Sequence, residues 1–278
     1  MQQAFDPKRF KEQERAGYNL IAARYEDASG ARAPVKDRML ELAELVPGQS
    51  VLEVASGPGM LAREAARRVA PHGEAVASDI ADAALEDGRR RAAAEGVTNI
   101  RFQAEDAEAM SFPDNAFDRV LCSMGLMHFP DAAAAAREML RVLKPGGRLV
   151  ASVWGSEPRV PFLACALDCL RRNLPPPKVE RPSIFRFGAT GALGMIAAGF
   201  VDVRIETALI ESSVPDAATY WKNFLDLAGV TTVVLAKLAP AMQEQLARDV
   251  ATDLAPYRSA DGYTLTGEIL IVSARKPA

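Results

Sequence analysis

The 278-residue sequence has little of what disulfide-rich, metal-binding, membrane-spanning or nucleic-acid-binding proteins need. Three cysteines and two histidines are too few for a disulfide framework or a zinc site. The longest apolar runs, 193–201 and 227–235, fall short of the roughly 18 residues that cross a bilayer. With 33 Lys and Arg against 36 Asp and Glu, the net charge of −3 offers no basic excess for binding phosphates. We therefore expect a globular protein with no metal, no nucleic acid and no membrane span.

The beginning of the sequence also lacks a secretion signal. Residues 1–17 are charged and contain no apolar run of about 7 to 15 residues. Together with the scarce cysteines, this predicts a cytoplasmic protein in a reducing compartment.

Strand and helix patterns alternate through the first half of the chain. Apolar runs predict strands at 50–55, 74–78, 100–104, 117–123 and 148–154, and amphipathic stretches predict helices at 35–46, 60–70, 81–94 and 132–143. Strands separated by helices of about 10 to 15 residues indicate right-handed crossovers and a parallel sheet. Two further strands, 201–211 and 263–274, lack a simple crossover between them. We predict a doubly wound α/β fold, with a mostly parallel seven-stranded sheet, an antiparallel last strand and a helical cap.

The segments around the predicted sheet divide the chain into four parts. Residues 1–34 are expected to form N-terminal lid helices and residues 35–154 the ligand-binding core. Residues 155–188, which are rich in proline around a helical stretch at 162–173, are expected to form a cap insertion. Residues 189–278, which begin with a helix at 189–198, would complete the sheet, with a helical acceptor-site insertion at about 216–256. We expect 1–34 and 155–186 to form a mobile lid.

A glycine loop follows the first predicted strand, at the sheet edge where such folds bind ligands. Gly57, Gly59 and Ala62 fit the G-x-G-x-x-G/A spacing of dinucleotide-binding loops, although an ordinary tight turn has the same spacing. Asp79 ends the second strand, 79 − 59 = 20 residues after Gly59, where a carboxylate can accept hydrogen bonds from a ribose diol. The pattern indicates a nucleoside-containing ligand.

Two further carboxylates separate this pattern from that of dinucleotide enzymes. Glu53 lies directly before the glycine loop, and Asp106 follows the third strand. A negative charge beside a helix N-terminus would repel a pyrophosphate, whereas it suits a ligand that carries an ammonium group. The sequence therefore predicts a ligand with a positive charge.

Four motifs in order now resemble those of the class I S-adenosylmethionine-dependent methyltransferases, in the branch similar to the ubiquinone and menaquinone methyltransferases. They are VLEVASGPG (51–59), SDIADAAL (78–85), AEDAEAMSFPDNAFDRVLCSMGLMHF (104–129) and EMLRVLKPGGRLV (138–150). The resemblance covers about residues 45–154 and implies a Rossmann-like fold that binds S-adenosylmethionine. The sequence departs from the family at Ala55, where relatives usually have their first glycine.

The resemblance implies a role for each loop residue at the methionine end of the cofactor. Ala55, Gly57 and Gly59 would line the methionine part, with Ser56 in the same loop. Glu53 would support the loop and the ammonium end. We expect binding to survive the extra methyl group of Ala55.

The remaining cofactor residues follow the next strands. The resemblance implies that Asp79 holds the ribose hydroxyls, that Ile80 packs on the adenine, and that Asp106 with the backbone of Ala107 reads the adenine amino edge. Ser123 would lie beside the reacting sulfonium at the end of the fourth strand.

Two aromatic side chains complete the candidate site. Tyr25 resembles a family tyrosine near the methionine end, or merely packs a mobile helix. His128 is the candidate base, should the acceptor lose a proton; the other interpretation is that it only shapes the cofactor pocket. Methyl transfer is an in-line displacement, so alignment of donor and acceptor in a dry pocket supplies most of the catalysis and a base is not obligatory.

The expected activity is transfer of a methyl group to a small, apolar or aromatic acceptor, with O- or C-methylation favoured. Ser123-Met124-Gly125-Leu126 replaces the Asn/Asp-Pro-Pro-Tyr motif of amino-directed relatives. An apolar acceptor pocket could be lined by five aromatic residues that could equally be core, Phe162, Phe185, Phe187, Trp221 and Phe224.

Two alternatives and two unknowns stay open. A nicotinamide-dependent oxidoreductase would use the same glycine spacing, but the sequence has no Tyr-x-x-x-Lys dyad and carries Glu53. A non-catalytic S-adenosylmethionine-binding module would fit the departure at Ala55. The sequence fixes neither the identity of the acceptor nor the oligomeric state, a homodimer included.

Overall fold

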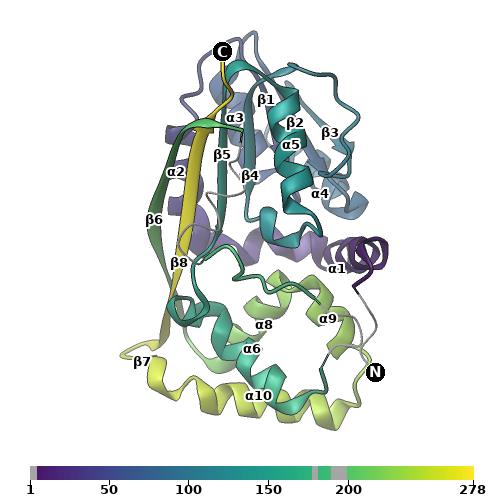
Figure 1. Cartoon of the computed structure of the whole chain (residues 1–278). Helices are drawn as coiled ribbons and strands as arrows, with labels where there is room; N and C mark the ends of the chain where they lie inside the picture. The colour runs from purple at the N-terminus through teal and green to yellow at the C-terminus, as the bar shows by residue number, and fades with distance from the viewer. Residues whose placement is uncertain (1–4, 177–180, 189–198) are drawn as a thin grey trace.

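The computed structural model describes residues 5–176, 181–188 and 199–278, which form one mixed sheet flanked by helices (Figure 1). The strand order is β3-β2-β1-β4-β5-β8-β6, and the short β7 pairs with β8. The strands are β1 (Ser50–Val54), β2 (Glu74–Asp79), β3 (Ile100–Ala104), β4 (Phe117–Ser123), β5 (Leu143–Trp154), β6 (Val201–Val214), β7 (Arg258–Ser259) and β8 (Gly262–Arg275).

The strand directions confirm the predicted sheet. β1 to β5 pair in parallel, while β8 runs antiparallel to both β5 and β6. The seven predicted strands are present, and the two-residue β7 adds a hairpin to β8. Val51, Leu52 and Val54 of β1 are almost fully buried, because helices cover both faces of the central strands.

The helices of the first half cover the two faces of the sheet. Figure 1 shows α5 on the face opposite to α2, α3 and α4. Their bounds are α2 (Ala33–Leu42), α3 (Met60–Val69), α4 (Asp82–Ala94) and α5 (Ala132–Val142).

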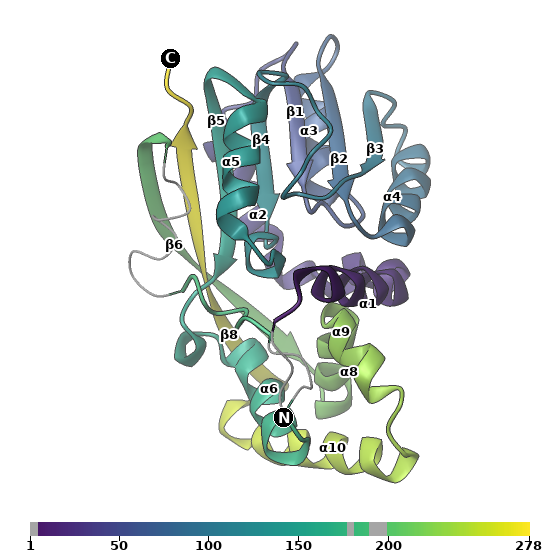
Figure 2. The same ribbon diagram turned by 45° about the vertical axis from the view of Figure 1, so that its right-hand side comes forward.

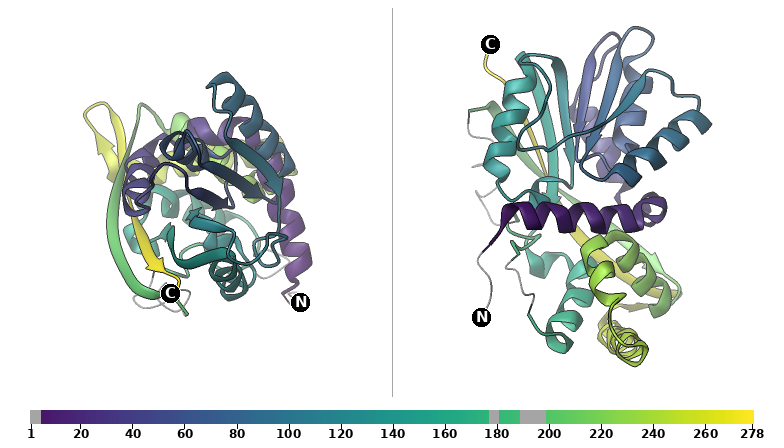
Figure 3. Two further views of the ribbon diagram at one scale, coloured as in Figure 1. Left: turned by 90° about the horizontal axis from the view of Figure 1, so that it is seen from above. Right: turned by 90° about the vertical axis from the view of Figure 1, so that its right-hand side faces the viewer.

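A second group of helices lies beyond the carboxyl edge of the parallel strands. They are α6 (Pro161–Asn173), α8 (Ala217–Leu227), α9 (Gly229–Leu235) and α10 (Pro240–Asp253). α1 (Pro7–Ala28) crosses between this helical group and the sheet (Figures 2 and 3). Gly17 of α1 meets Gly229 at the start of α9 so closely that a Cβ on Gly17 would lie 2.5 Å from the Val230 nitrogen. Because α1 touches both layers, its position controls access to the edge between them.

Some of the predicted elements have different ends in the structure. The helix predicted at 35–46 is Ala33–Leu42, and the strand predicted from Arg148 begins at Leu143. Phe117 pairs with Leu143 and Arg119 pairs with Arg148, so the extra residues of the Pro-Gly-Gly segment form an irregularity within β5, where Gly146 has a φ of +72°. The helix predicted at 189–198 lies outside the described residues. Within the described ranges no helix is long and apolar enough to cross a membrane.

Candidate functional site

A cavity opens at the carboxyl ends of β1, β2 and β4 and is covered by α1. The space between its atoms, with the open solvent at its mouth included, is about 810 Å³. Most of the residues predicted for the site line this cavity: Tyr25, Ala55, Gly57, Asp79, Ile80, Asp106, Ala107, Ser123 and His128.

Glu53, Ser56 and Gly59, also predicted for the site, support the glycine loop without lining the cavity. The Glu53 Oε2 atom accepts a hydrogen bond of 2.7 Å from the Ala62 backbone N–H, in the first turn of α3. Burial raises the pKa of Glu53 to about 8. Gly59 begins α3 at φ +72°, and a Cβ there would lie 2.9 Å from the Phe102 ring. Glycine is required at this position for both reasons.

Asp79 joins the end of β2 to the glycine loop. Its Oδ2 atom accepts a 2.7 Å hydrogen bond from the Gly57 N–H, and Oδ1 accepts one of 2.8 Å from the Ala81 N–H. Burial raises the pKa of Asp79 above its ordinary value. The carboxyl group therefore lies at the cavity wall in an orientation fixed by two backbone amides.

Ala55 has a left-handed backbone, a conformation that glycine adopts more readily than alanine. Its φ is +53°, a region that costs an L-residue about 1 to 2 kcal/mol. A Cβ built on Gly125, in the loop after β4, would lie 2.8 Å from the Ala55 Cβ. The absence of a side chain at Gly125 thus leaves space for the extra methyl group at Ala55.

Lys11, which the sequence analysis missed, reaches from α1 to the predicted adenine end. Its Nζ atom lies 2.7 Å from Asp106 Oδ2 and 2.6 Å from Glu108 Oε2. Although burial alone would lower the pKa of Lys11, hydrogen bonds to both carboxylates raise it. Lys11 therefore stays charged and fastens the first half of α1 over this end of the cavity.

The wall of the cavity also contains a chain of hydrogen-bonding side chains. The His128 Nδ1 and Glu14 Oε2 atoms are 3.0 Å apart, and His128 Nε2 lies 3.1 Å from the Tyr18 hydroxyl. Glu14 is buried and also forms an ion pair with Arg181. Burial, together with the nearby Arg186 guanidinium, lowers the pKa of His128 to about 4, so the imidazole is neutral near pH 7.

The donor and acceptor roles in this chain follow from its chemistry. A carboxylate only accepts, so Nδ1 carries the proton and donates to Glu14. Nε2 is then the acceptor for the Tyr18 O–H. The lone pairs of the Tyr18 oxygen remain for a ligand in the cavity.

The cavity-lining residues of α1 share one helical face. Lys11, Glu14, Tyr18, Ala22 and Tyr25 are spaced by three or four residues, so their side chains project on the same side. This mostly polar stripe was the pattern in the sequence that could have pointed to Lys11, Glu14 and Tyr18, which the sequence analysis missed. Only Tyr25 was identified, because the family resemblance pointed to it.

The aromatic residues considered for an acceptor pocket lie in the hydrophobic core. Phe162, Phe185, Phe187 and Phe224 are buried, and Trp221 packs against the same core. None of these aromatic residues lines the described cavity. The apolar residues Met124, Phe129 and Pro130 do line it.

Comparison with known proteins identifies relatives of the central region. Residues 51–147 match the family model described as a methyltransferase domain. The ubiquinone/menaquinone biosynthesis C-methyltransferase UbiE of Ectopseudomonas mendocina (strain ymp) is 41% identical over 157 residues, which are 54% of this chain and 61% of that protein. The chain thus spans less than two thirds of the length of this curated relative.

Solved structures share the architecture. Phosphoethanolamine N-methyltransferase 2 of Haemonchus contortus, in complex with phosphomonomethylethanolamine and S-adenosylhomocysteine, matches with a TM-score of 0.60 at 18% identity, over 97% of this chain and 59% of that one. The [4+2]-cyclase SpnF matches with a TM-score of 0.55 at 22% identity, over 88% of this chain and 80% of that one. Since one of these proteins is a cyclase, the reaction has to be argued from the site and not from the fold.

Proposed function

We propose that this chain contains a class I S-adenosylmethionine-dependent methyltransferase domain and that the protein transfers the methyl group of S-adenosylmethionine to a small acceptor. The observation that carries the proposal is that Asp79 and Asp106, on different strand ends, open on one cavity beside Gly57. When bound, S-adenosylmethionine supplies a methyl group activated by a positively charged sulfur.

The residues that line the cavity fit this cofactor in their chemistry. Asp79 offers carboxylate oxygens to ribose hydroxyls, and Ile80 offers an apolar surface to the adenine. Asp106 and the Ala107 backbone are available to the adenine amino edge. Gly57, at φ +54°, lets backbone rather than side chain face the methionine part.

The same site disfavours the nicotinamide alternative. A pyrophosphate binds to free amides at a helix N-terminus, next to the glycine loop. At α3 the Ala62 amide already donates to Glu53, which fills the space beneath the first turn. A dinucleotide would have to displace this buried carboxyl group.

The hydrogen-bonded chain of Tyr18, His128 and Glu14 favours an acceptor that loses a proton. The Tyr18 oxygen accepts a hydrogen bond from an acceptor O–H, its own proton is held by His128, and Glu14 orients the imidazole. A phenol, an enol or an activated carbon carries a proton that is lost on methylation, and methylation of these groups takes place on oxygen or carbon. The apolar border of Met124 and Phe129 suits an aromatic or apolar molecule.

The experiment that tests the function measures turnover and identifies the product. Purified protein is incubated with S-adenosylmethionine carrying a labelled methyl group and a panel of phenols, enols and primary amines. We expect S-adenosylhomocysteine to form with phenolic or enolic acceptors, and the label to appear on oxygen or carbon. Labelling of the amines alone would contradict the proposed acceptor class, and cofactor binding without any turnover across a broad panel would favour the non-catalytic module.

A further inference from the structure

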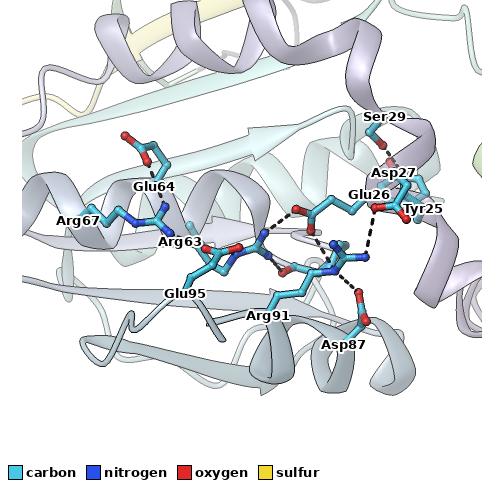
Figure 4. A network of polar contacts seen from close by, with 12 residues as sticks. Tyr25, Glu26, Asp27, Ser29, Arg63, Glu64, Arg67, Asp87, Arg91 and Glu95 are labelled. Atoms are coloured by element: carbon cyan, nitrogen blue, oxygen red, sulfur yellow. Dashed lines mark hydrogen bonds and ion pairs between the residues drawn. The ribbon is translucent and has the colours of Figure 1, made fainter. Parts of the chain in front are cut away.

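Arg63 of α3 is a buried arginine behind the glycine loop. Its side chain is 4% exposed, and it makes contacts with three separate elements (Figure 4). Its Nη1 atom donates to the Pro58 carbonyl at 2.6 Å, Nη2 to Glu26 Oε1 at 2.6 Å, and Nε to Glu95 Oε2 at 3.1 Å. A buried charge is stable only when it is paired and hydrogen-bonded in this way.

The three partners belong to parts of the molecule that are far apart in sequence. Pro58 belongs to the glycine loop and lines the candidate cavity. Glu26 lies in the last turn of α1, which covers that cavity, and Glu95 ends α4. One guanidinium therefore connects the floor of the site with its cover.

Within the part of the chain that the structure describes, no other side-chain contact of Glu26 is as close as the one with Arg63. Its Oε2 atom is buried without a hydrogen-bond partner and lies 3.4 Å from Arg91 Nε. Arg91 Nε is closer to Asp87, at 2.7 Å, so its interaction with Glu26 is secondary. The attachment of this end of α1 to the glycine loop depends mainly on Arg63.

We infer that Arg63 is a positioning residue that couples the seating of α1 to the conformation of the glycine loop, so that cofactor affinity and closure over the cavity change together. The inference rests on the proposed function. Without the guanidinium, the Pro58 carbonyl and Glu26 lose their common donor. The binding-competent arrangement is then less populated, and the apparent affinity falls by the same fraction.

Arg67, one turn further along α3, provides a matched control. It also contacts Glu95, at 2.5 Å, but it is 44% exposed and its other partner is Glu64 of the same helix. It contacts neither the glycine loop nor α1. Removal of Arg67 therefore costs α3 a similar charge and a similar ion pair while the connection to α1 remains intact.

The experiment compares Arg63→Met, Arg63→Lys, Glu26→Gln and Arg67→Met. S-adenosylhomocysteine affinity is measured by calorimetry, and hydrogen exchange of residues 18–28 is followed with and without saturating ligand. We expect Arg63→Met to raise Kd about tenfold and to lose ligand-induced protection of α1, with Arg67→Met within about twofold of wild type. A lysine side chain reaches fewer partners, so the Kd of Arg63→Lys should lie between those of wild type and Arg63→Met. Glu26→Gln should weaken the ligand-induced protection of α1, while the contact between Arg63 and the Pro58 carbonyl remains.

Two outcomes overturn the inference. One is an equal loss of affinity in Arg63→Met and Arg67→Met; the other is full ligand-induced protection of α1 in both Arg63→Met and Glu26→Gln. A merely structural role would lower thermal stability without changing that protection. If Arg63→Met does not fold, Glu26→Gln and Arg63→Lys carry the same comparison. Wild-type protein that binds no S-adenosylhomocysteine would contradict the proposed function, and the inference with it.

Discussion

The Tyr18 hydroxyl and the His128 Nε2 atom, 110 positions apart in the sequence, lie 3.1 Å from each other at the wall of the candidate cavity. Their rings are also in edge contact, at 5.4 Å between centroids. The contact joins α1 to the loop after β4, so it forms only when α1 lies over the cavity. We therefore expect proton handling and closure of the site to depend on each other.

Replacement of Tyr18 by phenylalanine should lower kcat by about 10- to 100-fold. The reason is that a general acid–base group typically accelerates a reaction by at least this factor. The ring and its packing remain, so the affinity for S-adenosylhomocysteine should change by less than about threefold. Steady-state kinetics and calorimetry on the same preparation measure both. An unchanged kcat would exclude the hydroxyl from the reaction.

The buried Glu53 carboxyl group should make stability depend on pH in a particular direction. Its pKa is about 8 in the folded protein against 4.5 ordinarily, so between these values the folded state holds a proton that the unfolded state has lost. The contribution of Glu53 to the free energy of unfolding is complete below pH 4.5 and is lost as the pH rises through 8. His128, with its pKa lowered to about 4, acts in the opposite sense but only below about pH 6.5.

Glu53→Gln removes this titration and leaves an oxygen for the Ala62 amide. Between pH 6.5 and 8.5 the wild type should lose about 1 to 2 kcal/mol more unfolding free energy than Glu53→Gln. Urea unfolding at the two pH values measures the difference, with the exposed Glu86→Gln as control. Parallel losses in wild type and Glu53→Gln would show that Glu53 is ionised throughout.

The sequence predicted the sheet and one wall of the site because both depend on short-range patterns. Strand periodicity placed Asp79 and Asp106 at strand ends, and parallel strands bring such ends to one edge. Glu14 and Tyr18 were missed because they lie on α1, and local spacing does not encode that this helix packs across the same edge, against His128. The early start of β5 at Leu143 was also missed, since the Pro-Gly-Gly segment that predicted a turn lies inside β5 as an irregularity, after the pairing of Leu143 with Phe117.

Ala55 and Gly125 should show strong energetic coupling. Gly125→Ala would bring a Cβ to 2.8 Å from that of Ala55 and should destabilise the protein by about 1 to 3 kcal/mol. Ala55→Gly removes that methyl group and the strain of the left-handed backbone. In the double variant the loss of unfolding free energy should be smaller by about 1 kcal/mol than the sum of the changes in the two single variants. Urea unfolding of all four proteins completes the cycle; additivity within about 0.5 kcal/mol would rule out the compensation.

The seating of α1 should depend on Gly17 but not on Gly30. A Cβ on Gly17 would meet the backbone of Val230, whereas nothing lies within 4 Å of one on Gly30. Gly17→Ala should therefore lower stability and speed hydrogen exchange in α1, against the usual gain from Gly→Ala in a helix. Gly30→Ala should leave exchange unchanged. Equal exchange in the two variants would mean that the contact with α9 does not hold α1 in place.

The expectation that α1 and the cap segment form a mobile lid has a separate test. Hydrogen exchange of wild-type protein should show residues 18–25 and 162–187, of which 177–180 lie outside the described residues, becoming protected when S-adenosylhomocysteine binds. The physical reason is that Lys11 and Tyr18 hold α1 by polar contacts that open more readily than a packed core. Full protection of both segments without ligand would identify them as fixed structure.

The central claim is that the cavity beside Asp79 binds S-adenosylmethionine, and calorimetric titration tests it most directly. S-adenosylmethionine, S-adenosylhomocysteine and NAD are titrated in turn into wild-type protein and into Asp79→Ala, whose fold is checked by circular dichroism. We predict that the wild type binds the first two ligands and not NAD, and that Asp79→Ala weakens both by about 1.5 to 3 kcal/mol, the value of hydrogen bonds to a charged group. Binding of NAD alone, or unchanged affinity in folded Asp79→Ala, would contradict the account.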